Sequence, residues 1–265
     1  MLAFASNSLL CRWALRDTAI DPASFAMLRL ISGAVALALL VRPSGVHGQE
    51  GDWRSAFALF GYAAAFSFAY VQLSAGVGAL LLFGVVQLTM VLCGLAAGDR
   101  ATLRHLAGLG AALAGLYVLV FAPGSHEFGS LRAQFLMAVA GVGWGVYCIR
   151  GRSATSAKAV TRGNFIRAAA LSITLLPLAV LHWHWDARGV ALAVTSGALT
   201  SGAGYVLWYS VTPHLQAIQA STVQLSVPLI TALAGILFLG ESLLASQVLG
   251  AVLILGGIGL TWKRT

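Results

Sequence analysis

Short polar breaks divide this chain into ten continuous apolar runs. The runs cover about residues 2–15, 23–41, 55–74, 76–97, 103–122, 132–150, 163–181, 188–210, 216–239 and 244–262. Most of them approach the roughly 20 apolar residues that an α-helix needs to cross a bilayer, and they do not alternate as strands of a membrane barrel do. Only 9% of the residues are charged, whereas a soluble domain carries roughly a quarter. The sequence therefore predicts an all-α membrane protein with ten transmembrane helices.

An internal repeat divides the ten runs into two halves. Residues 76–117 align with residues 218–259 when residue 76 is placed on residue 218. In each copy an apolar run ends in a glycine and an acid, Gly98-Asp99 in the first and Gly240-Glu241 in the second. Each half holds five spans, and because five is odd the two halves must insert in opposite orientations. The sequence thus predicts two inverted five-helix repeats, an arrangement that places a substrate where the repeats meet.

We expect the first repeat to cover about residues 1–122 and the second to cover residues 131–265. Residues 1–150 then hold the first five helices and the sixth, which opens the second repeat, and the whole chain forms one transport domain. The polar segment 151–163 is interpreted as a central cytoplasmic loop. The first run, Met1 to Leu15, is short for a span, so we expect the true start to lie upstream.

Basic residues indicate the orientation of the helices. With ten spans both ends of the chain lie on one side, and ten lysines or arginines fall in segments on that side against four on the other. Cytoplasmic segments of bacterial membrane proteins carry such an excess. We therefore expect a multi-pass protein of the bacterial inner membrane with both termini in the cytoplasm. The net charge of +8 is interpreted as topological, so no nucleic-acid partner is expected.

Several short motifs follow one another along the runs. They are Ser6-Asn7, Phe25-Ala26-Met27-Leu28-Arg29, Trp144 with Tyr147, Tyr205 with Trp208 and Tyr209, and Pro228 with Leu239-Gly240-Glu241-Ser242. In these motifs the chain resembles the EamA type of the drug/metabolite transporter superfamily, permeases of five plus five helices. The resemblance implies export or exchange of small metabolites, such as amino acids, by alternating access around a central cavity. Export of drugs or lipid-linked compounds is the alternative within the superfamily.

Neither an enzyme nor a cofactor-binding protein is expected. The spans contain no nucleophile motif, no zinc-binding pair and no buried acid pair. The His182-Trp183-His184-Trp185-Asp186 segment is interpreted as an aromatic belt at the membrane surface rather than a metal site. Pairs of glycines four residues apart, such as Gly94 with Gly98, allow close helix contact. The expected partners are therefore a small-molecule substrate and the bilayer, with the protein a monomer or a weak homodimer.

All eight acidic residues lie in breaks or at the ends of runs. A proton-coupled carrier usually keeps a carboxylate inside the membrane, where burial is costly unless the group is used. The sequence therefore favours facilitated transport or exchange over proton antiport through a carboxylate. His214 is the one histidine near a pathway, and an interfacial position is preferred to a titrating role.

Neutral polar and aromatic side chains within the runs are candidates for the cavity wall. The polar candidates are Asn7, Gln87 and Gln224, which either line the cavity or join helices to one another. The aromatic candidates are Tyr70, Trp144, Tyr147, Tyr205 and Trp208, with packing or an interfacial belt as the alternative. Pro228 removes a backbone donor within its run and is a candidate hinge.

Two arginines, Arg29 and Arg167, stand inside runs at matching positions of the two halves. Each lies one to two turns from the start of its run, so each side chain can extend to the membrane surface. A gate-side ion pair or a contact with a substrate carboxylate is the functional interpretation. Helix anchoring or a structural bridge is the preferred one.

Overall fold

The computed structural model describes residues 1–43, 50–96, 103–121, 130–151, 156–182, 184–211, 217–242 and 244–260. Every regular element in these ranges is a helix. The prediction of an all-α protein is therefore confirmed for the described part of the chain.

The helices follow the ten apolar runs. The first five are α1 (Leu2–Asp17), α2 (Pro22–Leu40), α3 (Trp53–Tyr70), α4 (Ala75–Ala96) and α5 (Leu103–Phe121). The next, α6 (Leu131–Gly151), precedes two composite rods, the first made of α7 (Ala157–Ser172), the 3₁₀ turn η2 (Ile173–Leu175) and α8 (Leu176–Leu181). The second is made of α9 (Ala187–Thr195), the π-helical segment η3 (Ser196–Ala203) and α10 (Gly204–Val211). The last are α11 (Ala217–Leu239) and α12 (Ala245–Leu260).

One predicted loop is partly helical. Residues 151–163 were expected to be a loop, but α6 continues to Gly151 and α7 begins at Ala157. Thr161 Oγ1 donates a hydrogen bond to the Ala157 carbonyl oxygen at 2.8 Å, and the Asn164 side chain accepts one from the backbone N–H of Asp52 at 2.9 Å. Polar residues at this helix start are therefore held by local and cross-chain bonds, so the helix extends beyond its apolar run.

Acidic residues begin three of the helices. Asp21, Asp52 and Asp186 each accept hydrogen bonds from two backbone N–H groups in the first turn of α2, α3 and α9 respectively. A carboxylate at this position satisfies donors that have no partner within the helix and complements the helix dipole. These acids therefore serve helix starts at the ends of the bundle.

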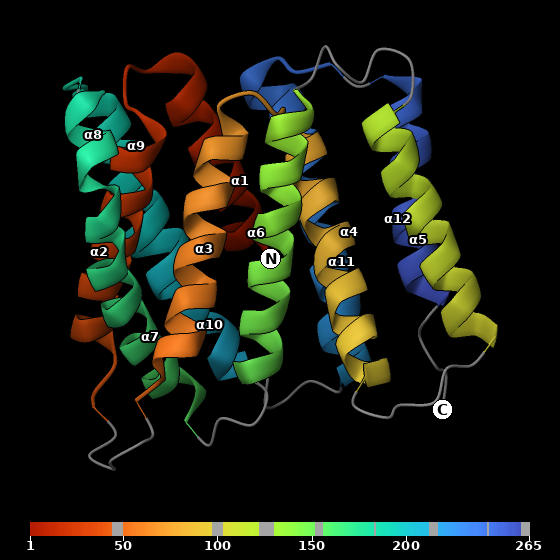
Figure 1. Cartoon of the computed structure of the whole chain (residues 1–265), viewed down its shortest axis with the longest axis horizontal. Helices are drawn as coiled ribbons and strands as arrows, with labels where there is room; N and C mark the ends of the chain where they lie inside the picture. The colour runs from red at the N-terminus through yellow and green to blue at the C-terminus, as the bar shows by residue number, and fades with distance from the viewer. Residues whose placement is uncertain are drawn as a thin grey trace.

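The helices pack as an elongated bundle with one separate pair at its edge (Figure 1). At that edge α5 packs against α12, and this pair meets the remaining helices mainly through α4. Further inside, α6 contacts both α3 and α4, while α2 contacts α7 and η3, and α1 contacts α11 and the α9–η3 rod. The centre of the bundle is thus shared by helices from early and late parts of the chain.

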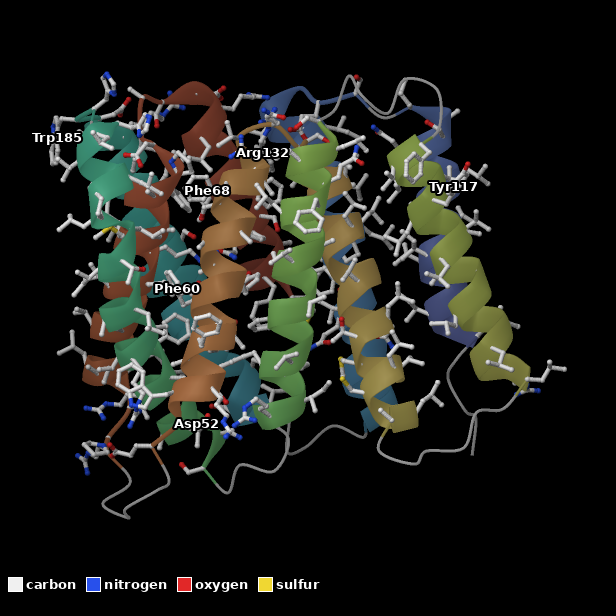
Figure 2. All side chains as sticks on the ribbon, in the orientation of Figure 1. Asp52, Phe60, Phe68, Tyr117, Arg132 and Trp185 are labelled. Carbon is white, nitrogen blue, oxygen red and sulfur yellow. The ribbon has the colours of Figure 1, made fainter. Side chains whose placement is uncertain are left out.

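The outer surface is apolar and the polar clusters lie at the two ends of the bundle. Leu39, Leu103 and Leu237 are 81%, 83% and 76% exposed. Figure 2 shows Asp52 at one end of the bundle and Arg132 and Trp185 at the other. Extended apolar surface of this kind fits contact with lipid.

Five helices are long and apolar enough to cross a membrane: Pro22–Leu40, Ala75–Ala96, Leu131–Gly151, Ala157–Leu181 and Ala187–Trp208. Shorter apolar helices cover Leu106–Phe121, Ser226–Leu239 and Ala245–Leu260. The structure therefore supports a multi-pass membrane protein.

Candidate functional site

An interior pocket lies where the central helices meet. Its cavity volume is about 20 Å³, so the surrounding side chains nearly fill it. Its lining side chains come from α1, α2, α3, α4, α6, η3, α10 and α11, and are Phe4, Asn7, Ser8, Arg29, Tyr62, Leu82, Phe83, Trp144, Thr200, Ser201, Tyr205 and Gln224. Of the residues expected from the sequence, Asn7, Trp144, Tyr205 and Gln224 line this pocket, together with Arg29.

Arg29 is buried in the pocket wall. Its residue is 3% exposed, so the guanidinium stays inside the bundle, although its place in the helix would also allow it to extend to the membrane surface. Its Nη2 donates to the Tyr62 hydroxyl at 3.0 Å and its Nε to Ser201 Oγ at 3.4 Å. Its Cζ also lies 5.1 Å from the ring centre of Tyr62 and 4.9 Å from that of Phe66. Polar partners and aromatic faces thus hold the cation inside the bundle.

A hydrogen-bond network extends from Arg29 across three further helices. The Tyr62 hydroxyl accepts from Arg29 and, at 3.4 Å, from Asn7 Nδ2. Asn7 Oδ1 in turn accepts from Ser196 Oγ at 2.7 Å and from Thr200 Oγ1 at 3.4 Å. Asn7, Tyr62 and Ser196 are all buried, and buried polar groups need such partners. The network therefore fixes α1, α2, α3 and η3 around the pocket.

The π-helical segment η3 brings small and polar residues against α2. A Cβ on Gly197 would collide with Ser32 Oγ and with the carbonyl oxygen of Arg29. Only glycine therefore permits the close approach that places Ser201 beside the Arg29 side chain. Single turns of π-helix are frequent at functional sites, and this segment supplies both Thr200 and Ser201 to the pocket.

Aromatic rings form a continuous cluster along the pocket. The Trp144 ring centre lies 5.1 Å from that of Tyr62, 5.5 Å from that of Tyr205 and 5.5 Å from that of Tyr147, on which it stacks. The Phe4 ring lies edge-on to Trp144, Tyr205 and Trp208 at 6.5, 5.6 and 6.1 Å. Such edge-to-face arrangements are favourable for aromatic side chains. The pocket therefore combines a buried cation with aromatic rings, and Tyr62 contacts both.

Four of the expected cavity residues lie outside the pocket lining. Gln87 faces a separate small pocket between α4, α5 and α12. Tyr70 is fully buried and donates to the Ala75 carbonyl oxygen at 3.2 Å, which joins the end of α3 to the start of α4. Tyr147 and Trp208 stand behind Trp144 and Phe4 as a second layer of rings. Their aromatic and amide types gave no indication of which helix face they occupy.

Pro228 and Arg167 also lie away from the pocket lining. Pro228 is buried within α11, one turn beyond Gln224. Arg167 Nη1 donates to the carbonyl oxygens of Glu50 at 2.7 Å and Gly163 at 3.0 Å, and its Cζ lies 5.8 Å from the Trp53 ring centre. These are the contacts of a structural bridge between α7 and the start of α3.

Other pocket residues were not singled out from the sequence as cavity residues. Tyr62 stands alone among alanines and aromatics of α3, and no local motif marks it. Ser8 and Phe4 flank the Ser6-Asn7 motif, but neither was among the candidates. Thr200 and Ser201 form a polar pair inside the eighth apolar run, and that pair is a signal that could have identified them.

Ion pairs join helices at both ends of the bundle. At one end Glu241 Oε1 lies 3.2 Å from Arg12 Nε, and Glu241 Oε2 accepts from the backbone N–H of Ala75 at 2.8 Å. Gly240 makes this possible, because its φ of +63° turns the chain back beneath the end of α11. At the other end Asp52 accepts from Arg150 Nη2 at 2.9 Å. Each cluster connects helices that are distant in the sequence.

A second, larger hollow lies on the outside of the bundle. It is an apolar groove of about 500 Å³ between α3 and α6, lined by residues such as Phe57, Gly61, Phe135 and Val142. Phe57 and Phe135 are 66% and 68% exposed, so the groove faces the surroundings rather than the interior. It shares no lining residue with the interior pocket.

Within the described ranges no three histidine, cysteine or acidic side chains gather as a metal site. His182 Nδ1 and His184 Nδ1 instead lie 3.0 Å from the carbonyl oxygens of Leu178 and His182. The structure does not describe Trp183, His214, Gly98 or Asp99, nor the side chain of Tyr209. Expectations for these residues stay predictions.

Comparison with known proteins agrees with this geometry. The EamA-like transporter family matches residues 131–263. An uncharacterized protein of Pseudomonas aeruginosa is 50% identical over 98% of this chain and 91% of its own length. A probable terminal-alkyne amino-acid exporter of Streptantibioticus cattleyicolor is 25% identical over 92% of this chain and 84% of its own. An uncharacterized transporter of Bacillus subtilis is 24% identical over 90% and 86%.

The fold also matches a solved structure, described only as the crystal structure of a protein. The two chains superpose with a TM-score of 0.64 at 21% identity, over 98% of this chain and 95% of that one. The apolar helices define a multi-pass helical membrane protein, and the family match makes it a transporter. The chain belongs to the EamA-like transporter family, within the drug/metabolite transporter superfamily.

Proposed function

We propose that the protein exports or exchanges small metabolites, amino acids or related compounds, across the bacterial inner membrane. The observation that carries this proposal is the interior pocket, whose lining comes from both halves of the chain. Phe4, Arg29 and Tyr62 precede residue 122, while Trp144, Thr200 and Gln224 follow residue 131. A pocket at the junction of two halves can open to either side when the halves rock against each other.

The helix contacts support two inverted repeats and ten spans. Each helix of the first half has a counterpart in the second: α6 for α1, α7–α8 for α2, α9–α10 for α3, α11 for α4 and α12 for α5. When each helix is replaced by its counterpart, the helix pairs that share the most extensive contacts remain pairs that are in contact. The α3–α6 contact becomes that of α9 and η3 with α1, and the α4–α6 contact becomes that of α11 with α1. The α2–α7, α4–α11 and α5–α12 contacts map onto themselves. Such a pattern is what a pseudo-two-fold axis through the bundle produces.

The character of the pocket favours metabolites over lipid-linked compounds. Asn7, Ser8, Thr200, Ser201 and Gln224 offer amide and hydroxyl groups beside a buried cation. A hydrocarbon chain would leave the buried Arg29 Nη1, which has no partner among the described residues, without a hydrogen-bond acceptor, which is costly. The apolar groove between α3 and α6 suits lipid chains, but it is separate from the pocket. The relative named as an amino-acid exporter gives independent support.

Exchange without proton coupling through a carboxylate is part of the proposal. Each described acid lies at a helix end or in the adjoining segment, and none lines the pocket. The excess of basic residues in alternate breaks supports cytoplasmic termini.

Counterflow uptake in proteoliposomes tests this function. Vesicles preloaded with a pool of amino acids and related acids should accumulate labelled members of the pool, with or without a pH gradient. Trp144→Ala and Gln224→Ala should each lower the initial rate by roughly tenfold or more, because each removes a pocket contact. Gln87→Ala is the matched control, since that amide lies outside the pocket and its loss should leave the rate unchanged.

Absence of exchange for the whole pool would sink the metabolite assignment, and uptake of lipid-linked compounds instead would replace it. Equal rates for the two glutamine variants would remove Gln224 from the site.

A further inference from the structure

A buried arginine without a counter-charge stands in the pocket wall. Arg29 is 3% exposed, and neither of its two hydrogen-bond acceptors, the Tyr62 and Ser201 hydroxyls, carries a charge. Its Nη1 is buried and has no hydrogen-bond partner among the described residues. The described acidic residues lie at helix ends, and those in ion pairs bind Arg12, Arg16, Arg150 and Arg162 rather than Arg29. An unpaired buried charge is costly, so it calls for a specific partner.

The groups around Arg29 are suited to bind an anion. The Tyr62 hydroxyl oxygen already accepts hydrogen bonds from Asn7 and Arg29, and its O–H proton has no acceptor among the described residues. Ser201, whose hydroxyl contacts Arg29 Nε, and Ser8 also line the pocket. A planar guanidinium edge next to hydroxyl donors matches the two oxygens of a carboxylate.

The number of charges limits the ligand to a net charge of −1. One arginine balances one negative charge, and no second basic residue in the described part of the chain lines the pocket to balance a dianion such as a phosphate ester. Among the described residues no acid lines the pocket to balance an ammonium group, so with a zwitterion bound the pocket would keep one uncompensated positive charge. The rings of Phe4, Trp144 and Tyr205 suit a flat apolar body.

We propose that Arg29 is the carboxylate anchor of the pocket, and that the transported compounds are organic monocarboxylates of net charge −1 with a compact apolar body. This inference rests on the proposed transport function and names its substrate class. Amino acids modified at the amino group and deaminated acids meet the description, whereas free neutral amino acids do not.

Binding to the purified full-length protein in detergent tests the anchor directly. The probes are two isosteric pairs, benzoate with benzamide and phenylacetate with phenylacetamide, together with phenylalanine and inorganic phosphate. Calorimetric titration at neutral pH should give dissociation constants roughly 10- to 100-fold lower for each carboxylate than for its amide, as expected for a charge-assisted bond to a buried cation. In Arg29→Gln the ratio of the amide's dissociation constant to that of the carboxylate should fall to near one in each pair.

Arg29→Lys and Arg167→Lys complete the series. Lysine keeps the charge but loses the planar edge, so Arg29→Lys should bind the carboxylates weakly while still preferring them to the amides. Arg167 bridges α7 to the Glu50 carbonyl outside the pocket, so Arg167→Lys should retain the wild-type ratios. If Arg29→Gln does not fold, the wild-type ratios and their reduction in Arg29→Lys decide the question.

Equal affinities within the pairs, a preference that survives Arg29→Gln, or binding by none of the carboxylates would each overturn the inference. Tighter binding of phenylalanine or of phosphate would replace monocarboxylates by zwitterions or by inorganic anions. Counterflow separates the two proposals. Exchange that ignores substrate charge overturns the anchor and keeps the transporter, whereas carboxylate binding without any exchange keeps the site and overturns the transport function.

Discussion

Glu241 shows how one side chain can hold several helices together. Its carboxylate pairs with Arg12 of α1 and accepts the first backbone N–H of α4, while Arg12 Nη1 reaches the carbonyl oxygens of Tyr70 and Val71 at 3.0 and 2.9 Å. The two charged side chains are 14% and 10% exposed. A pair this buried is damaging to break because the remaining charge has no partner.

Glu241→Ala should therefore lower the stability by about 3 kcal/mol or more, measured as a fall in the thermal unfolding temperature in detergent. Glu241→Gln keeps an acceptor for the backbone N–H of Ala75, so its unfolding temperature should lie between those of the wild type and Glu241→Ala. Asp17→Asn is the control, since its pair with Arg16 is 31% exposed on both sides and such pairs contribute about 0–1 kcal/mol. A larger loss in the Asp17 variant would contradict this account.

Asp186 should make the stability of the fold depend on pH. Backbone N–H groups of Gly189 and of Ala19 donate to its carboxylate and lower its pKa below the usual value. A carboxylate whose pKa is lower in the folded state stabilises the fold above the unfolded pKa of about 3.9. That stabilisation is lost as the pH falls through the folded value.

The difference in unfolding temperature between the wild type and Asp186→Ala should therefore be largest near neutral pH and shrink below about pH 4. Thermal unfolding scans from pH 7 to pH 3 measure it. A difference that grows towards acid pH would contradict the assignment. Ser156 precedes α7 without a side-chain cap bond, so Ser156→Ala is a control that should show no such pH dependence.

At the scale of elements, the contact between α2 and η3 positions the pocket. Gly197→Ala should push these segments apart, because the new methyl group meets Ser32 and the Arg29 carbonyl. We expect a loss of about 1–3 kcal/mol in stability, as for overpacking elsewhere, and reduced counterflow because the Arg29 side chain shifts from the pocket. Gly61→Ala is the control, since nothing lies within 4 Å of its new methyl group, and it should be neutral or slightly stabilising. Similar behaviour of the two variants would contradict this role for Gly197.

The elements were largely predictable from the sequence, and the exceptions have physical reasons. Apolar runs bounded by proline, glycine and acids gave nearly all helix ends to within a few residues. The predicted start of α7 was wrong because the first turn of this helix is polar. That turn is stabilised instead by contacts such as the hydrogen bond between Asn164 and Asp52. The π-helical course of η3 depends on close packing with α2, and no periodicity of hydrophobic residues encodes that.

At the scale of the whole molecule, residue type predicted the site only in part. Asn7, Trp144, Tyr205 and Gln224 line the pocket, whereas Gln87 faces α5 and α12 instead. Which side of a nearly uniformly apolar helix faces the centre is decided by its neighbours, so the sequence of one helix cannot supply it. For Arg29 the sequence left anchoring, a structural bridge and a substrate contact open, because its partner Tyr62 lies 33 positions away in the chain.

The unpaired charge of Arg29 also has an electrical consequence. If a monocarboxylate fills the pocket, the loaded carrier is close to neutral at its centre, while the empty carrier holds one positive charge there. Moving a charge through the membrane potential changes its energy by about 2.3 kcal/mol per 100 mV for a full crossing. Voltage would therefore act on the return of the empty carrier and not on the step that carries substrate. An empty pocket also leaves this buried charge without a counter-charge while the halves rock, which is costly and would favour one-for-one exchange over net flow.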